Sequence, residues 1–395
     1  MCRTYCKQGL LILWEVTVRR SLLLAAVLLV LASDASPAAA ALPAGTDARA
    51  SAPVEIANAS QALSPPQIYG AWHCGNDYCT WGAVRSIAQF DSTNHWLIDR
   101  GDGRPSVNLV VLSFVNPLSL LHQTTDAGTL NGVPRGMTPE IVNYFTSRGV
   151  RVMLSIGGIT YTDGWDAALA ENPTLFGQRA AAMASQLGVG IEIDYEQNTA
   201  PNLTALQAFI DAYRAIHPFD ASGTRPQARL TIDVAAGDRW LIALNRKATA
   251  DWLRTDTPIL DYANAMVPAR PASASSAQAN WQEHVDGKPQ YSPPVPPLAP
   301  AKFTGGIYIA YGGKALPECI DYNSSAQRAT APYVRTVLPN GAGTTAGMLG
   351  FMFWAAERPS TRGIGTVPPY TCEGGVGAGA TALTIPVPMP ALRPS

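Results

Sequence analysis

The sequence has little charge and no basic run. Charged residues make up 14% of its 395 residues, against about 25% in average proteins. Its 28 Lys+Arg and 29 Asp+Glu nearly balance, which gives a formal net charge of −1. Because phosphate backbones are bound by clustered Lys and Arg, the absence of a basic run argues against nucleic acid as a partner. The balance equally gives no reason to expect an acidic substrate.

The apolar run near the N-terminus is short for a membrane span. It follows Arg19 and Arg20 and extends from Ser21 to Ala32, about a dozen residues where a span needs about 20. A basic start, a short apolar stretch and small residues at its exit are typical of a secretory signal peptide. We therefore expect residues 1–40 to be a cleaved signal, the mature protein to be secreted and extracellular, and no stable membrane partner. An uncleaved anchor is the alternative.

Cysteine is also scarce, with six in the chain, and Cys2 and Cys6 fall in the expected signal. The other four are Cys74, Cys79, Cys319 and Cys372. An even number of cysteines in an exported protein predicts two disulfides. Three pairings are possible, and we favour the one in which each cysteine bonds to its nearest neighbour in sequence. The spacing lacks the close pairs typical of zinc sites, so we expect no metal.

Glycine and proline are abundant, with 34 and 32 residues, and they concentrate in particular segments. Residues 41–65 are rich in Ala, Ser and Pro, and we expect an extended arm there. Residues 373–395 are rich in Gly, Ala and Pro and are expected to form a tail. The remaining 66–372 are expected to form one domain, in which the proline-rich stretch 268–300 is a surface insertion.

Eight short apolar or β-branched runs recur along this domain, and each is expected to be a strand. They cover residues 68–72, 109–115, 152–156, 190–195, 230–234, 262–267, 306–310 and 349–354. Helical patterns separate some of them. Asn172 and Pro173 are typical of a helix N-terminus, and Gly188 of its end. A second helix is expected between Pro201 and Pro218, where apolar residues recur at helical spacing.

The alternation of strands and helices predicts an α/β fold, and eight repeats over about 300 residues favour a single (β/α)8 TIM barrel. A doubly wound open sheet is the alternative. Only 38 residues (311–348) separate the last two expected strands. We therefore expect a barrel without a large α+β insertion.

The most informative segment places three acids on one face of an expected strand. Glu192, Asp194 and Glu196 alternate with apolar or aromatic residues, so in a barrel the acids face the lumen. Three carboxylates in a poorly solvated lumen cannot all ionise cheaply, so at least one is expected to hold a proton, as a general acid must. The alternatives are a solvated edge strand or a divalent metal site built from the three acids.

The segment Gly190-Ile-Glu-Ile-Asp-Tyr-Glu196 resembles the catalytic strand of family 18 glycoside hydrolases, the chitinases and endo-β-N-acetylglucosaminidases, whose pattern is Asp-x-x-Asp-x-Asp-x-Glu. Met153-Leu-Ser-Ile-Gly-Gly158 is similar to the Ser-x-Gly-Gly strand of that family. Gly350-Phe-Met-Phe-Trp354 is similar to its last strand, which ends in a tryptophan on the floor of the sugar site.

This resemblance implies a role for each acid. Glu196 matches the general acid, Asp194 the residue that orients the substrate acetamido group, and Glu192 the inner acid that shares a proton with Asp194. It also implies that the 2-acetamido oxygen of the sugar attacks the anomeric carbon, so that the configuration is retained. The implied substrate is an amino-sugar polysaccharide or oligosaccharide with β-1,4-linked N-acetylglucosamine, such as chitin. No cofactor is implied, and we expect a monomer.

Aromatic rings stack on the apolar faces of sugars, and the carboxyl ends of barrel strands hold the active site. The expected substrate contacts are Trp72, Trp354, Met266, Asn264 and Tyr308. The first two are aromatic residues at strand ends, and Met266 matches the methionine of the family's sixth strand. Asn264, Tyr308 and Tyr311 are candidates to replace a tyrosine of that strand, because Pro268 stands in its place.

The sequence departs from the family pattern at three positions. Val189 replaces the first acid of the motif, Glu192 is longer than the usual aspartate, and Pro268 replaces the tyrosine that supports the acetamido oxygen. These departures favour an alternative of another class, a weakly active or inactive chitin-binding barrel of lectin-like or inhibitor-like character. A third possibility is an endo-β-N-acetylglucosaminidase that acts on N-glycans.

Overall fold

The computed structural model describes residues 68–99, 105, 107–235, 240–266, 281–308, 348–354 and 356. All of them belong to one compact unit, Ser60–Ser395. The expected signal peptide, arm and tail lie outside the described residues, as do Pro268, Tyr311, Cys319 and Cys372. None of the described helices has the length and apolar character needed to cross a membrane.

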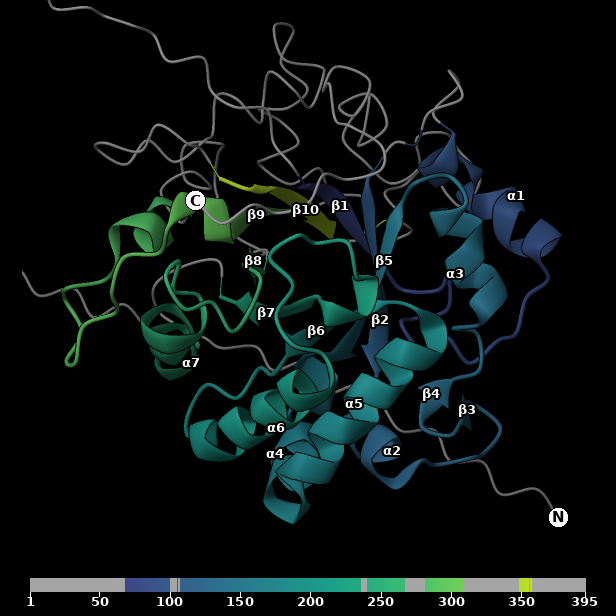
Figure 1. Cartoon of the computed structure of the whole chain (residues 1–395). Coiled ribbons are helices and arrows are strands. Elements are labelled where there is room, and N and C mark those ends of the chain that lie inside the picture. The colour runs from purple at the N-terminus through teal and green to yellow at the C-terminus, as the bar shows by residue number, and fades with distance from the viewer. Residues whose placement is uncertain are drawn as a thin grey trace, which may run out of the picture. The chain divides into compact units, whose positions relative to one another are not determined.

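In the described part of the chain, parallel strands pair edge to edge around a closed barrel (Figure 1). In pairing order the strands are β1 (Ile68–His73), β2 (Leu109–Val115), β5 (Arg151–Gly157), β6 (Gly190–Asp194), β7 (Leu230–Val234), β8 (Ala263–Ala265), β9 (Phe303–Tyr308) and β10 (Gly350–Trp354), which returns to β1. Each predicted strand is present, so the TIM-like α/β fold is confirmed. The connection from β9 to β10 lies outside the described residues, and with it the expected absence of an insertion.

Two strands differ from the prediction by more than one residue at an end. The predicted strand 262–267 is reduced to the three residues of β8, and the predicted strand 306–310 begins earlier, at Phe303. A single turn of 3₁₀-helix, Pro300–Lys302, leads directly into β9. The earlier start places Thr304 of β9 opposite Asn264 of β8, a pairing that matters for the site below. Strands β3 (Thr129–Leu130) and β4 (Val133–Pro134) form a separate antiparallel pair.

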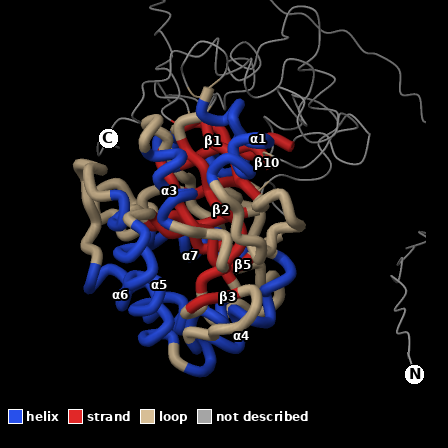
Figure 2. Tube along the Cα trace, turned by 90° about the vertical axis from the view of Figure 1, so that its right-hand side faces the viewer, coloured by secondary structure: helices blue, strands red, loops and turns tan. Residues whose placement is uncertain are grey.

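Helices surround the strands on the outside (Figure 2). They are α1 (Ile87–Ile98), α2 (Pro117–His122), α3 (Pro139–Thr146), α4 (Thr162–Glu171), α5 (Pro173–Leu187), α6 (Leu203–Ile216) and α7 (Ile242–Lys247), with short turns of 3₁₀-helix at Ile159–Tyr161 and Pro226–Ala228 and of π-helix at Ala248–Trp252. Helix α5 starts as predicted, since the Asn172 side chain accepts from the Leu175 N–H at 3.0 Å. It ends at Gly188, whose φ is 67°. Helix α6 starts at Leu203 because Asn202 caps it.

The strands have two different faces. Outward side chains such as Ile191, Ile193 and Tyr195 are wholly buried in the large apolar core between barrel and helices. A smaller apolar cluster, which includes Leu109, Met153 and Met352, is formed by the other faces of the strands and fills the lumen. The acids of β6 share the lumen with this cluster, so little water can reach them.

Candidate active site

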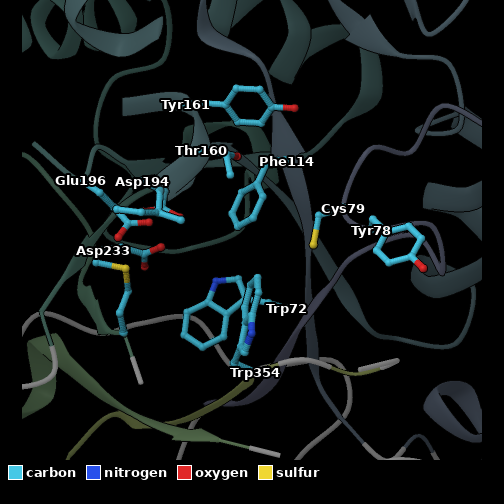
Figure 3. Close-up of a pocket in the computed structure, with 12 residues that line it drawn as sticks. Trp72, Tyr78, Cys79, Phe114, Thr160, Tyr161, Asp194, Glu196, Asp233 and Trp354 are labelled. Carbon is cyan, nitrogen blue, oxygen red and sulfur yellow. The ribbon is translucent and has the colours of Figure 1, made fainter. Parts of the chain in front are cut away.

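A cavity of about 270 Å³ opens beside the carboxyl ends of the strands. Figure 3 shows three carboxyl groups on one side of it, those of Asp194, Glu196 and Asp233, and the indoles of Trp72 and Trp354 facing them. Asp194 is the last residue of β6, and Glu196 lies just beyond that strand. The strand order therefore brings the predicted acids and the two predicted tryptophans together.

Glu192 lies deeper in the lumen and is held by neutral donors. Its Oε1 accepts from the Trp72 indole N–H at 2.9 Å, and its Oε2 accepts from the Asn264 side-chain amide at 2.5 Å. The Asn264 amide is oriented by Thr304, whose hydroxyl donates to Asn264 Oδ1 at 2.5 Å. Glu192 is wholly buried, and the hydrogen bonds tie it to β1, β8 and β9.

The position of Asn264 corrects the prediction that it contacts substrate. Asn264 is wholly buried, and both groups of its amide are used by Glu192 and Thr304. Met266, two residues further along the chain and on the same inward face, does line the cavity. Asn264 therefore orients Glu192 and lies one layer too deep to meet a ligand.

The two sequence motifs lie side by side in the barrel. Gly157 of β5 is in register with Asp194 of β6, and the Gly158 N–H donates to the Asp194 carbonyl at 3.1 Å. Gly157 has a φ of 125°, and a Cβ there would lie 1.9 Å from the Asp194 carbonyl oxygen. A side chain at residue 157 is therefore excluded, because it would displace the backbone that carries Asp194.

Burial raises the pKa of each acid in this cluster. The pKa of Glu192 is raised mainly by burial, against the donors that it accepts from. The pKa of Asp194 is raised well above its usual range by burial and then by the charges of Glu196 and Glu192. Burial raises the pKa of Glu196 to about 7, although the backbone N–H of Ile159 donates to it and favours the charged form. The cluster thus retains protons near neutral pH.

Asp233 is a fourth acid that the sequence reasoning missed. It is on β7, is 2% exposed and lines the cavity, and its side chain shares a hydrogen bond with Glu192. Burial raises its pKa well above the usual range, as do the charges of Glu192 and Asp194. The signal was present in the sequence, because Thr231 and Asp233 alternate with apolar residues just as the acids of β6 do.

Aromatic rings form the wall opposite the acids. The rings of Trp72 and Trp354 are tilted by 58° with centroids 6.1 Å apart, and Phe114 stacks on Trp354 at 5.8 Å. Met266 also lines the cavity. The contact of Trp72, Trp354 and Met266 with a sugar stays a prediction.

Three tyrosines remain, of which one was predicted to contact substrate and two were missed. The backbone of Tyr308 ends β9, but its side chain lies outside the described residues. Tyr161 and the 90% exposed Tyr78 line the cavity and were missed, since both lie off the strands, where periodicity gives no signal. The hydroxyl groups of Tyr161 and Tyr78 both point away from the acids (Figure 3).

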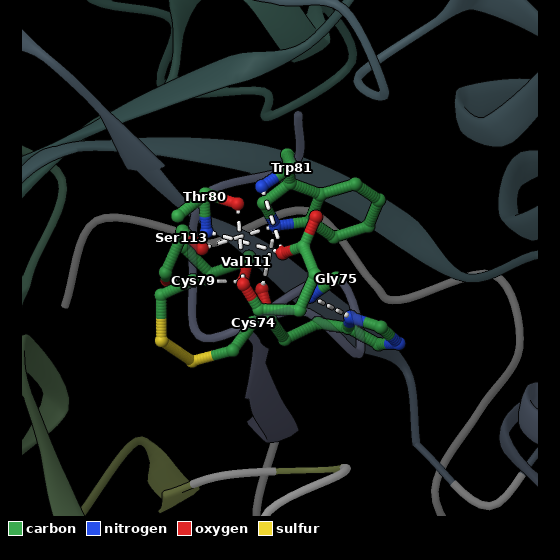
Figure 4. Close-up of a disulfide and its surroundings, with 9 residues drawn as sticks. Cys74, Gly75, Cys79, Thr80, Trp81, Val111 and Ser113 are labelled. Atoms are coloured by element: carbon green, nitrogen blue, oxygen red, sulfur yellow. Dashed lines mark hydrogen bonds between the residues drawn. A yellow bond between two sulfur atoms is a disulfide. The ribbon is translucent and has the colours of Figure 1, made fainter. Parts of the chain in front are cut away.

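The predicted disulfide between Cys74 and Cys79 is confirmed (Figure 4). It closes the loop that follows β1, and Cys79 lines the cavity. Both cysteines pack against Phe114 and Trp354 of the aromatic wall. The loop is fixed at its far end by Trp81, whose indole N–H donates to the carbonyls of His73 and Ser113 at 3.1 and 3.0 Å.

Among the described residues, no group of three or more His, Cys, Asp or Glu side chains is arranged to hold a metal ion. Of the four carboxyl groups, Glu192 accepts from Trp72 and Asn264 and shares a hydrogen bond with Asp233, whereas Oδ1 of Asp194 and Oδ1 of Asp233 are buried without a partner.

No family model and no curated protein matches this sequence. Among solved structures, the chain is similar to a GH18 chitinase from Pseudoalteromonas aurantia, at a TM-score of 0.50 and 12% identity over 80% of this chain and 98% of that one. The fold is GH18-like. A chitinase from Rhizomucor miehei (TM-score 0.44, 14% identity, 76% and 98% covered) and an endo-β-N-acetylglucosaminidase from Cordyceps militaris (0.44, 15%, 82% and 92%) also match. In this barrel, Asp194 and Glu196 lie at the carboxyl end of β6, the fourth strand of the barrel along the chain.

Proposed function

We propose that this protein is a secreted glycoside hydrolase that cleaves β-1,4-linked N-acetylglucosamine polymers such as chitin. One observation carries the proposal: Glu196, whose pKa is raised to about 7, lines a cavity beside the buried Asp194 and opposite two tryptophans. A carboxylic acid that keeps its proton near neutral pH can protonate the oxygen of a leaving sugar. A GH18-like fold is compatible with this activity, but the site rather than the fold supports it.

The proposed mechanism assigns one step to each acid. Glu196 protonates the glycosidic oxygen while the 2-acetamido oxygen of the sugar attacks the anomeric carbon and forms a cyclic oxazolinium ion. Asp194 holds the acetamido N–H and stabilises the positive charge on the ring. Water then attacks the anomeric carbon from the side that the leaving group vacated, Glu196 takes its proton, and the configuration is retained. A second carboxylate is unnecessary because the acetamido oxygen of the substrate is itself the nucleophile.

The neutral aromatic wall supports an uncharged sugar as ligand. Trp72, Trp354 and Phe114 offer ring faces to the apolar C–H faces of a pyranose. The cavity holds no Lys, Arg or His side chain among its described lining residues, so an acidic sugar would meet carboxyl groups without a compensating cation.

The test is hydrolysis of soluble chitooligosaccharides by the wild-type protein and by Glu196→Gln. We expect the wild type to release shorter products with retained configuration, and the variant to lose about 10²–10⁴-fold in kcat, the usual contribution of general acid catalysis. Glu140→Gln, the same change at an exposed carboxylate on α3, is the matched control and should leave kcat unchanged. Hydrolysis that survives Glu196→Gln would refute the assignment.

A second function, sugar binding without cleavage, is favoured by one observation. Of the tyrosines that line the cavity in the described residues, Tyr78 and Tyr161, neither directs its hydroxyl at Asp194 or Glu196 (Figure 3). An acetamido oxygen in the cavity would then receive no phenol donor from these described lining residues, in contrast to the family pattern. Binding of chitooligosaccharides at micromolar concentration with no turnover, unchanged by Glu196→Gln, would establish this function instead.

A further inference from the structure

Two carboxyl groups of the cluster, Glu192 and Asp233, are in direct contact, and the sequence pattern accounts for only one of them. Their side chains share a hydrogen bond. A hydrogen bond between two carboxyl groups requires a proton on one of them, because an ionised carboxylate only accepts. The pair therefore holds at least one proton, and the neighbouring groups decide which acid carries it.

The neighbours of Glu192 favour its ionised form. The indole N–H of Trp72 can only donate, and it donates to Oε1 of Glu192 at 2.9 Å. The amide of Asn264 is held with its N–H side toward Oε2, since its oxygen accepts from Thr304. Both oxygens of Glu192 thus receive donors, which is the arrangement that stabilises a buried carboxylate.

The neighbours of Asp233 favour its neutral form. Asp233 is 2% exposed, and its Oδ1 is buried without any N–H or O–H donor from the protein. It also faces the negative charges of Glu192, Asp194 and Glu196. An ionised Asp233 would be a buried, poorly solvated anion among like charges, so the proton of the pair belongs on Asp233.

We propose that Asp233 is a positioning residue of this site, protonated and donating to Glu192, which keeps Glu192 ionised beneath Asp194. The proposal rests on the proposed function for its kinetic test only. Asp233 also lines the cavity beside Asp194 and Glu196 (Figure 3). Its carboxyl group therefore links the sealed layer around Glu192 to the layer that meets a ligand.

The consequence for Asp194 follows from charge. The ionised Glu192 disfavours ionisation of Asp194, whose pKa is raised by burial and by the charges of Glu196 and Glu192. Without the proton on Asp233, the buried Glu192 would take up a proton itself, and that charge would be lost. Asp233 thus acts on the reacting layer through Glu192, and the apparent pKa values belong to the whole cluster.

Two variants test whether Asp233 acts as a hydrogen-bond donor to Glu192 or as a charged group. Asp233→Asn keeps the shape and an N–H that can donate to Glu192, so we expect kcat/KM within about threefold of wild type and an unchanged pH profile. Asp233→Ala removes the donor, so we expect kcat/KM on chitooligosaccharides to fall at least tenfold, which corresponds to about 1.4 kcal/mol, and the alkaline limb of the profile to move to lower pH. An Asn variant as impaired as the Ala variant would overturn the proposal, as would an Ala variant with unchanged kinetics.

Infrared spectroscopy of the protein without ligand tests independently whether Asp233 is protonated. The infrared spectrum of the wild-type protein at pH 7 should contain the carbonyl stretch of a protonated carboxylic acid that is missing in Asp233→Asn. An unchanged carboxylic acid band would refute the proposal, even if the variant were active. If the wild type cleaves no amino sugar, the proposed function fails, and the infrared comparison still tests the proton on Asp233.

Discussion

The proposed role of Glu196 requires a raised pKa, and this raised pKa lowers the stability of the folded protein at neutral and alkaline pH. Burial raises the pKa of Glu196 from 4.5 to about 7 in the folded protein. The folded state therefore binds this proton more tightly than the unfolded state does. The stability of the folded protein is unaffected below pH 4.5, the pKa of the unfolded state. It falls as the pH rises from 4.5 to about 7, and it stays lower at higher pH.

Glu196→Gln should remove this loss. We expect the variant to match the wild type in free energy of unfolding at pH 4 and to exceed it at pH 8 by up to about 3 kcal/mol, the equivalent of the raised pKa. Urea denaturation at the two pH values measures both differences. Glu140→Gln is the control, because the pKa of the exposed Glu140 is lowered by hydrogen bonds, so its amide variant has no such gain. Equal stability of wild type and Glu196→Gln at pH 8 would contradict the raised pKa.

Individual site residues differ in how far the sequence could predict them. Glu192, Asp194 and Glu196 were predictable because three acids on one face of an apolar strand are rare and have few structural explanations. Asp233 carries the same alternation, but a single acid in a five-residue strand gives a weak signal. Asn264 was assigned to the wrong layer, because the sequence gives the face of a residue but not its depth along the barrel axis.

Helices and strands were predicted well where residues within the element itself determine its ends or its burial. Asn172, Pro173 and Gly188 set the ends of α5, and continuous apolar runs identified β2 and β5, which are buried on both faces. Strand β8 was predicted too long because only three of its residues pair with neighbours. The loops that supply Tyr78, Ile159 and Tyr161 to the cavity follow no period, so only the folded chain places them there.

The loop closed by Cys74 and Cys79 links stability to the aromatic wall. Closing a loop of five residues limits the unfolded chain and is worth about 2 kcal/mol in the chain-entropy model. We expect the double variant Cys74→Ala/Cys79→Ala to lose stability of this order in thermal or urea unfolding. We also expect a raised KM for chitooligosaccharides, because both cysteines pack against Phe114 and Trp354.

The double variant is preferable to a reductant, which also reaches cysteines outside the described residues. Ser185→Ala, on the outer helix α5, is a suitable control for a small side-chain change remote from the cavity. A double variant with unchanged KM would mean that the loop supports the fold alone. Unchanged stability would mean that the native contacts hold the loop without the disulfide.

At the scale of the whole barrel, the two side chains that donate to Glu192 of β6 come from strands that are not neighbours of β6 in the sheet. Thr304 of β9 donates to Asn264 of β8, Asn264 donates to Glu192 of β6, and Trp72 of β1 donates to the other oxygen of Glu192. Strands β1 and β9 are separated by β10. The charge of Glu192 is therefore shared by donors from two separate strands of the barrel wall, β1 and β8.

This arrangement predicts energetic coupling between Thr304 and Trp72, which do not bond to each other. Thr304→Val and Trp72→Phe should each lower the free energy of unfolding by about 1–3 kcal/mol, since each leaves a buried acceptor short of a donor. The double variant should lose less than the sum by about 0.5 kcal/mol or more. The reason is that without Thr304 the Asn264 amide can turn its oxygen toward Glu192. Glu192 then binds a proton and has less charge for Trp72 to stabilise.

Urea unfolding of the four proteins in this double-mutant cycle measures the coupling. Thr304→Ser keeps the hydroxyl donor and should restore most of the stability lost in Thr304→Val. A second cycle that pairs Trp72→Phe with Ser185→Ala should be additive within about 0.5 kcal/mol, because Ser185 bonds to Ala181 and His217 outside the barrel. Additivity in both cycles would mean that Glu192 keeps its charge whichever donor is lost, and that the two sides of the lumen act independently.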